Sequence, residues 1–171
     1  MNSTPSPPPL HYDDAFLRSI LRDVRVIAMV GASPNWVRPS NFVIKYLQSK
    51  GFRVIPVNPG HAGKKILGET VYASLKDIPD RFDMVDVFRA SDAAGGIVDE
   101  AIAIAAAKGI RVIWMQLGVR DDAAARRAEA AGLTVVMDHC PKIEYGRLFG
   151  ELGWCGVNSR IVSSKRPKMS A

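Results

Sequence analysis

The fold is decided by the stretch Arg25-Val-Ile-Ala-Met-Val-Gly31-Ala-Ser-Pro-Asn35-Trp-Val-Arg38-Pro39-Ser40. An apolar run of strand length ends at Gly31, a loop of small and polar residues follows, and Pro39 is well placed to begin a helix. This pattern is typical of the first strand–loop–helix unit of a nucleotide-binding sheet, where backbone N–H groups and a helix N-terminus face phosphate oxygens. We therefore expect a phosphate-bearing ligand at this loop.

The same loop departs from the dinucleotide-binding fingerprint. The pattern G-x-G-x-x-G has three glycines and, about 20 residues on, an acidic residue that takes the ribose hydroxyls. Here Gly31 stands without the other two glycines, and the second apolar strand runs into Asn58 and Pro59 with no carboxylate at its end. A nicotinamide cofactor is therefore the weaker prediction, although the pair Lys64–Lys65 keeps a phosphorylated dinucleotide open.

Strand-like and helix-like segments alternate along the chain. Strands rich in Val, Ile and Met, as buried parallel strands are, are expected at residues 25–31, 53–57, 84–88, 111–116 and 133–137. Helices are expected at 12–22, 40–50, 92–108, 121–131 and 141–151, with a loop and one short helix between the second and third strands. The alternation predicts an α/β fold, namely a Rossmann-like doubly wound parallel sheet of about five strands in the order 3-2-1-4-5, with three α/β/α layers.

Composition predicts a single domain. The chain has 171 residues, 47% hydrophobic and 23% charged, which suits one core. We expect a disordered Pro/Ser-rich leader at 1–10, one domain over 11–155 and a flexible basic tail at 156–171. Four of the 23 basic residues lie in that tail, and the other 19 nearly balance the 17 acidic ones, so the net charge of +6 does not predict a nucleic-acid surface.

Membrane, metal and catalytic signals are absent from the sequence. No apolar run reaches the roughly 18 to 20 residues of a membrane span. Cys140 and Cys155 form no disulfide framework, and the three histidines are scattered, so we expect a cytoplasmic protein without a metal site. His139 and Cys140 are adjacent, but neighbours on an extended segment point to opposite sides, so they do not predict a catalytic dyad.

Candidate ligand-binding residues follow from the geometry of an open parallel sheet, which binds ligands at the carboxyl ends of its strands. Arg38 and Arg89 can each contact a phosphate or pair with an acidic neighbour, and Gln116 is a strand-end amide that needs partners if buried. This rim suits an adenine nucleotide with an extra phosphate and an extended amide chain. The strand ends carry Gly31, Ala32, Ser33, Pro34, Arg38 and Ser40; Asn58 and Pro59; Phe88 and Arg89; Met115 and Gln116; and Asp138, His139 and Cys140.

Ordered motifs at these positions resemble those of a known family. They are Val-Gly31-Ala-Ser-Pro-Asn, Arg38-Pro-Ser40, Val54-Ile-Pro-Val-Asn-Pro59, Val85-Asp-Val-Phe-Arg89, Trp114-Met-Gln-Leu-Gly118 and Val136-Met-Asp-His-Cys140. Together they resemble the small stand-alone bacterial CoA-binding domain proteins of the YccU type over residues 12–150. That family is similar to the CoA-binding domain of the succinyl-CoA synthetase alpha subunit and of ADP-forming acyl-CoA synthetases.

The resemblance implies that CoA or an acyl-CoA lies across the strand ends. It places the pyrophosphate near Gly31, Ala32, Ser33, Pro34, Arg38 and Ser40, the adenosine part near Asn58, Pro59, Val87, Phe88 and Arg89, and the pantetheine near Met115 and Gln116. The synthetases carry their catalytic histidine and ATP-grasp partner outside this domain, so we expect a non-catalytic binding module or sensor. An NAD(P)-binding redox enzyme or sensor, and a scaffold that docks onto a synthetase-like protein, are the alternatives, and a homodimer stays open.

Overall fold

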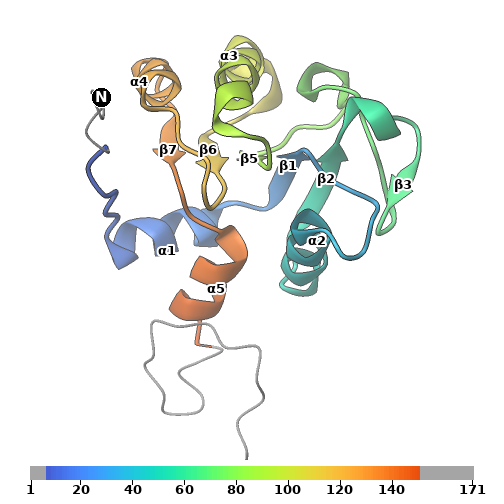
Figure 1. Cartoon of the computed structure of the whole chain (residues 1–171), viewed down its shortest axis with the longest axis horizontal. Helices are drawn as coiled ribbons and strands as arrows, with labels where there is room; N and C mark the ends of the chain where they lie inside the picture. Colours follow the sequence, from blue (N-terminus) through green and yellow to red (C-terminus); the bar gives the residue numbers. More distant parts are fainter. Residues whose placement is uncertain (1–6, 151–171) are drawn as a thin grey trace, which may run out of the picture.

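The structure, a computed structural model, describes residues 7–150 and places one parallel sheet between two layers of helices (Figure 1). In sheet order the strands are β2 (Arg53–Val57), β1 (Val26–Val30), β5 (Met84–Val87), β6 (Val112–Met115) and β7 (Thr134–Val136). One face is covered by α3 (Ser91–Lys108) and α4 (Asp122–Ala130), and the other by α1 (Asp14–Asp23), α2 (Pro39–Ser49) and α5 (Pro141–Leu148). The predicted α/β class and its three layers are confirmed.

Parts of the expected domain boundaries lie outside the described residues, namely 1–6 of the leader and the whole basic tail together with Cys155. Residues 7–10 are placed against the domain. The Arg120 guanidinium donates to the Pro8 carbonyl, and Leu10 packs on the core beneath α3 and α4. No helix within residues 7–150 is long and apolar enough to cross a membrane.

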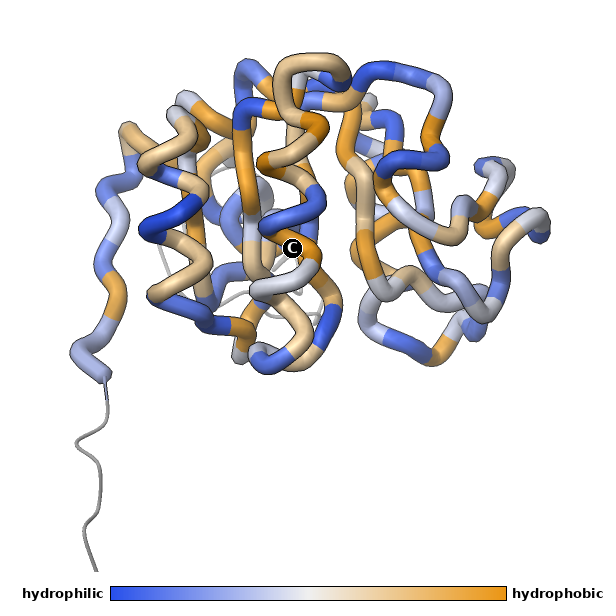
Figure 2. The backbone as a smooth tube through the Cα atoms, turned by 90° about the horizontal axis from the view of Figure 1, so that it is seen from above, coloured by the Kyte–Doolittle hydropathy of each residue, from blue (hydrophilic) through white to orange (hydrophobic). Residues whose placement is uncertain are grey.

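The core has two halves, one on each face of the sheet. Val85 and Val87 point to the α3 and α4 side, whereas Met29 and Trp114 point to the side of α1, α2 and α5. This division follows from the pleat, because successive side chains on a strand point to opposite faces. Figure 2 shows the strands as largely apolar stretches of chain.

The predicted strand order was wrong in one respect. The order 3-2-1-4-5 puts the third main strand outside the second, whereas the structure pairs β5 with β1 and leaves β2 at the edge. The main strands therefore run in the order 2-1-3-4-5. The cause is the segment between β2 and β5, which recrosses the sheet over its α3 face and buries Leu75, Ile78 and Phe82 there.

Pro56 is the sequence signal for this order. Its carbonyl accepts from the Tyr72 N–H at 3.1 Å, so the backbone of Pro56 faces the outer side of β2. The missing N–H of the proline therefore leaves no carbonyl of β1 without a hydrogen bond. Proline within a strand is found at sheet edges for this reason. A second strand inside the sheet, as first expected, fits this residue poorly.

The recrossing segment holds more regular structure than the expected loop and short helix. It contains the 3₁₀ turns η1 (Pro59–His61) and η2 (Leu75–Asp77) and a two-stranded ribbon, β3 (Lys65–Ile66) with β4 (Glu69–Thr70). Leu67 and Gly68 form the ribbon's turn with positive φ angles of 47° and 89°. Two consecutive positive φ angles are typical of the tight turns that suit a twisted hairpin.

The Asp83 carboxylate joins the starts of three strands. One oxygen accepts from the N–H groups of Arg25 at 2.8 Å and Val26 at 2.9 Å, and the other accepts from Arg111 at 3.3 Å. Burial raises the pKa of Asp83, but these backbone hydrogen bonds and the Arg111 guanidinium outweigh it and hold the pKa below its ordinary value. The ionised carboxylate therefore stabilises the pairing of β1 with β5.

We expect Asp83→Ala to lower the free energy of unfolding by about 1–3 kcal/mol at pH 7, because two N–H groups at the start of β1 lose their acceptor. Urea unfolding measures this. Asp23→Ala is the matched control, since the exposed Asp23 side chain accepts no hydrogen bond within residues 7–150. Equal midpoints for the two variants would contradict the role given to Asp83.

Candidate functional site

The strand order reverses between β1 and β5. After β1 the chain passes to α2 on one face of the sheet, and after β5 it passes to α3 on the other (Figure 1). In an open parallel sheet this arrangement leaves a crevice at the carboxyl ends of the two strands. The expected order had placed Phe88 and Arg89 at the far edge of the sheet. The observed order brings them directly beside Gly31.

Gly31 is required by packing within the chain. Its φ angle is 91°, and a Cβ built there would lie 2.2 Å from the Phe88 carbonyl oxygen and 3.1 Å from Cδ of Arg89. Any other residue would push the ends of β1 and β5 apart. The need for glycine is therefore explained without a ligand, while the close approach still sets the floor of the crevice.

The loop after Gly31 is shaped by its own polar side chains. The Ser33 N–H donates to Ser40 Oγ at 3.1 Å, Asn41 Nδ2 donates to the Ser33 carbonyl at 3.1 Å, and Asn58 Nδ2 donates to the Ala32 carbonyl at 2.8 Å. Ser40 and Asn58 thus position the loop. Their side chains are engaged inside the protein.

Helix α2 begins at Pro39, and Arg38 occupies the N-cap position. Ser40 lies in the first turn of the helix and is buried. The N–H groups of Ala32 and Ser40 have no hydrogen-bond acceptor within residues 7–150. Free donors at a helix N-terminus favour an anion, which keeps the phosphate expectation for this loop physically sound.

A cavity of about 230 Å³ lies on the α3 side of the crevice, and we call it the α3-side cavity. The expected residues Gly31, Asn58, Pro59 and Arg89 line it, and Arg89 has no hydrogen-bond or ion-pair partner within the described part of the chain. The sequence analysis did not predict the other residues that line this cavity, because it did not predict that the segment between β2 and β5 crosses the α3 face of the sheet. These residues are Val30, Val57, Ala73, Ser74, Leu75, Ala93, Ile97 and Glu100.

A second cavity, of about 510 Å³, lies on the opposite side, between α2 and α5, and we call it the α5-side cavity. Phe88 and Gln116 are the expected residues that line it. Sequence reasoning predicted the last helix but not that its first turn would form a wall of the site. The other lining residues are Val37, Pro39, Phe42, Val43, Leu117, Cys140, Lys142 and Ile143.

The structure does not bring every expected residue into contact with a cavity. Val87 and Met115 are fully buried in the core half under α3 and α4 and line neither cavity. Ala32 is also fully buried, whereas Pro34 and Arg38 are exposed on the loop between the cavities. The expectation that Val87 and Met115 touch a ligand therefore has no support from their side-chain positions.

Asp86 is the polar residue that sequence reasoning missed. It lies fully buried in the middle of β5, between Met29 and Trp114 in the sheet register, and one of its carboxyl oxygens has no partner. The other lies 3.4 Å from Gln116 Nε2, and Gln116 lines the α5-side cavity. The signal was a single acidic residue inside an apolar strand.

Burial raises the pKa of Asp86 to about 8, against the hydrogen bond from Gln116, which favours the ionised form. Asp86 is therefore protonated at neutral pH, and the floor below the α5-side cavity is uncharged. Gln116 is held from both sides, since its Oε1 accepts from the Leu117 N–H at 3.2 Å.

His139 and Cys140 are directed to different places, as expected for neighbours on an extended segment. His139 Nδ1 lies 2.8 Å from the Met137 carbonyl and its ring packs edge-on against Tyr12, whereas Cys140 faces the α5-side cavity. Burial raises the pKa of the Cys140 thiol in spite of the Ile143 N–H, which favours the thiolate. The thiol is therefore protonated at neutral pH and is a poor nucleophile.

A larger cavity, of about 660 Å³, lies at the opposite, amino-terminal end of the strands. Three of the four cations that line it, Arg25, Lys108 and Arg111, already donate hydrogen bonds to groups of the protein. The Arg111 guanidinium donates to the Asp23 carbonyl and to Asp83, and Lys108 donates to the Ile78 carbonyl. These contacts stabilise helix ends and strand starts, so the candidate site stays at the carboxyl ends.

The fold is that of a doubly wound α/β domain with a crevice at its strand switch. Comparison with known proteins agrees, because the family described as CoA binding domain matches residues 25–146, and the chain belongs to that family. YneT of Bacillus subtilis is 35% identical over 131 residues, which cover 77% of this chain and 93% of YneT.

Solved structures and a larger enzyme show the same relationship. A protein from Pyrococcus horikoshii OT3 is 37% identical with a TM-score of 0.76, covering 88% of this chain and all of that one (100%). The ADP-forming acetate–CoA ligase II of Archaeoglobus fulgidus is 35% identical over 96 residues, which are 53% of this chain but 13% of the ligase. The match to the ligase is thus confined to a small part of it.

We expect Asp86→Asn to change how stability depends on pH. Between about pH 4 and pH 8 the unfolded chain has lost this proton while the folded protein keeps it, so the free energy of unfolding falls as pH rises through this range. The asparagine carboxamide keeps the acceptor for Gln116 and cannot ionise. Urea unfolding of both proteins from pH 5 to pH 8 should show the variant gaining stability relative to the wild type as pH rises. Parallel pH profiles would mean that Asp86 does not hold its proton.

Proposed function

We propose that this protein binds coenzyme A or an acyl-CoA across the carboxyl ends of its strands, as a binding module or sensor without ligation chemistry of its own. The nucleotide end lies in the α3-side cavity, the pyrophosphate at the loop after Gly31, and the pantetheine arm crosses Phe88 toward Gln116. Membership of the CoA-binding domain family supports the class of ligand.

The observation that carries this proposal is a pair of cavities lined by two consecutive residues. Phe88 lines one cavity and Arg89 the other, with Gly31 directly beneath both residues. A ligand with a charged nucleotide end and a long, less polar arm fits such a site, because its two ends can occupy different environments. Arg89 forms no ion pair within residues 7–150 and supplies positive charge at the nucleotide end. Glu100 lines the same cavity, and its carboxylate accepts a hydrogen bond from the Lys76 N–H.

An NAD(P) site is the alternative, and the end of β2 disfavours it. A dinucleotide needs a ribose-binding acid or a cation for a 2′-phosphate there. Both ends of the Asn58 carboxamide are engaged, since Oδ1 accepts from the Gly60 N–H at 2.9 Å and Nδ2 donates to the Ala32 carbonyl. The basic pair Lys64–Lys65 is exposed and lines neither cavity.

The absence of ligation chemistry is proposed from the side chains at the site. Cys140 is a protonated thiol, and Asp86 is buried beneath Gln116 with no place on the lining of either cavity. Within residues 7–150 no three His, Cys, Asp or Glu side chains gather as a metal site. Transfer of an acyl group would then belong to a separate, synthetase-like protein.

Isothermal titration calorimetry with CoA, dephospho-CoA, NAD and NADP tests the proposal. We expect binding of CoA, weaker binding of dephospho-CoA because it lacks the 3′-phosphate, and no binding of NAD or NADP at matched concentrations. Binding of NADP without CoA would overturn the proposal in favour of the dinucleotide alternative. Binding of none of them would favour the scaffold role.

The Arg89→Ala variant tests the nucleotide end. We expect it to weaken CoA binding by about 1–3 kcal/mol, because a charge-assisted hydrogen bond to phosphate is lost. Arg126→Ala is the matched control, since Arg126 is exposed on α4 and lines neither cavity. Unchanged CoA affinity in Arg89→Ala would remove Arg89 from the site.

A further inference from the structure

We infer that the α5-side cavity binds the aliphatic acyl group of an acyl-CoA, so that the ligand is the thioester rather than free CoA. This inference rests on the proposed function and adds the class of ligand to it. The cavity walls, their charge, their rigidity and their position beside the nucleotide end all support it.

The walls of the α5-side cavity are apolar. Seven of its ten lining residues are apolar, and three of these are strongly exposed, namely Leu117 at 63%, Val37 at 53% and Phe42 at 51%. Leu117 follows β6, while the other two flank the start of α2. Burying such surface is favourable by about 25 cal/mol per Å², and the polar amides of a pantetheine arm gain little from it.

The charge in and under this cavity suits a neutral group. No acidic side chain from residues 7–150 lines it, and Asp86, below Gln116, holds its proton at neutral pH. Lys142 is the cation on the lining, and its Nζ lies 5.6 Å from the centre of the Tyr46 ring, in a cation–π contact. Lys142 is the one charged side chain among the described residues that line the cavity, against seven apolar ones, so the lining as a whole favours an aliphatic group.

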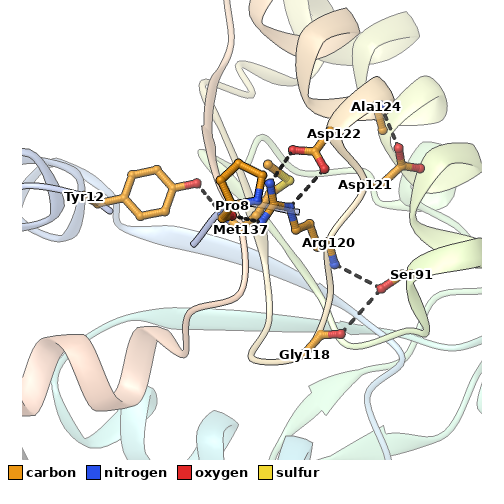
Figure 3. A network of polar contacts seen from close by, with 9 residues as sticks. All are labelled: Pro8, Tyr12, Ser91, Gly118, Arg120, Asp121, Asp122, Ala124 and Met137. Atoms are coloured by element: carbon orange, nitrogen blue, oxygen red, sulfur yellow. Dashed lines mark hydrogen bonds and ion pairs between the residues drawn. The ribbon is translucent and has the colours of Figure 1, made fainter. Parts of the chain in front are cut away.

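The loop that carries Leu117, on one side of the α5-side cavity, is held in place by the protein itself. Ser91 Oγ accepts from the Arg120 N–H at 3.0 Å and lies 3.4 Å from the Gly118 carbonyl, and Arg120 also pairs with Asp122 (Figure 3). The Gly118 N–H donates to Asp138 at 2.6 Å. The loop that carries Leu117 is thus held from several sides, and ordering it on binding costs little.

The position of the cavity is what selects an acyl chain from other apolar occupants. Phe88 lines the α5-side cavity, and the next residue, Arg89, lines the α3-side cavity. A single ligand that passes over these two residues therefore has its nucleotide end in the α3-side cavity and its thioester end in the α5-side cavity. An apolar group covalently attached to the arm is delivered to these walls without a second binding event.

Calorimetric titration with CoA, acetyl-CoA, butyryl-CoA and hexanoyl-CoA tests the inference. Affinity should rise with chain length by up to about fourfold per methylene, the factor that corresponds to burial of one CH₂. If CoA binds and the acyl-CoAs bind no more tightly, the inference fails while the proposed function stands. If neither CoA nor any acyl-CoA binds, the proposed function itself fails.

Leu117→Ser, compared with Leu67→Ser, locates the acyl group. Both leucines are exposed loop residues, at 63% and 41%, and Leu67 lies on the turn of the β3–β4 ribbon, outside both cavities. The ratio of hexanoyl-CoA to CoA affinity should fall severalfold in Leu117→Ser and stay at the wild-type value in Leu67→Ser. Equal ratios in the two variants would place the acyl chain elsewhere and overturn the assignment.

Discussion

The structure depends on the close approach of β1 and β5 at their carboxyl ends. The Phe88 N–H donates to the Val30 carbonyl at 2.8 Å, and the Phe88 carbonyl fills the space where a Cβ at position 31 would lie. From these two strand ends the chain leaves toward opposite faces of the sheet, β1 toward α2 and β5 toward α3 (Figure 1). The two cavities are the result, since the consecutive residues Phe88 and Arg89 line different ones.

Two aspartates near β5 show how differently burial acts on the same side chain. Asp83 accepts two backbone N–H groups and faces Arg111, and its pKa stays below the ordinary value although burial raises it. Asp86, three residues on, has one long hydrogen bond, and burial raises its pKa to about 8. The first carboxylate stabilises the sheet as an anion. The second is tolerated in the core because it keeps its proton.

The sequence was sufficient for the five strands of the main sheet, the five α-helices and the class of fold, because periodicity and strand-end signals are local. It did not predict the β3–β4 ribbon. The sequence analysis did not predict the position of β5 in the sheet, because the direction in which the chain crosses over depends on packing between distant segments. Pro56 indicates that β2 is an edge strand, because a strand at the edge of a sheet can lack one backbone N–H donor without leaving a neighbouring strand unpaired. The site followed the same rule. Gly31, Arg89 and Gln116 were predictable as strand-end residues, whereas the walls formed by Ile97 or Ile143 depend on how α3 and α5 dock.

The engagement of the loop's own polar groups changes how its residues should be interpreted. Ser40 and Asn58 look like phosphate and ribose ligands in the sequence, yet their side chains bind the chain itself, at Ser33 and Ala32. Replacing either one would therefore alter the backbone of the loop, and a loss of affinity for a ligand would not identify a direct contact. Within residues 7–150 the N–H groups of Ala32 and Ser40 and the Arg89 guanidinium have no hydrogen-bond partner, so they are the donors of the crevice that are free to meet an anion. Under the function proposed above, ligands would therefore be distinguished mainly by what their two ends place in the two cavities.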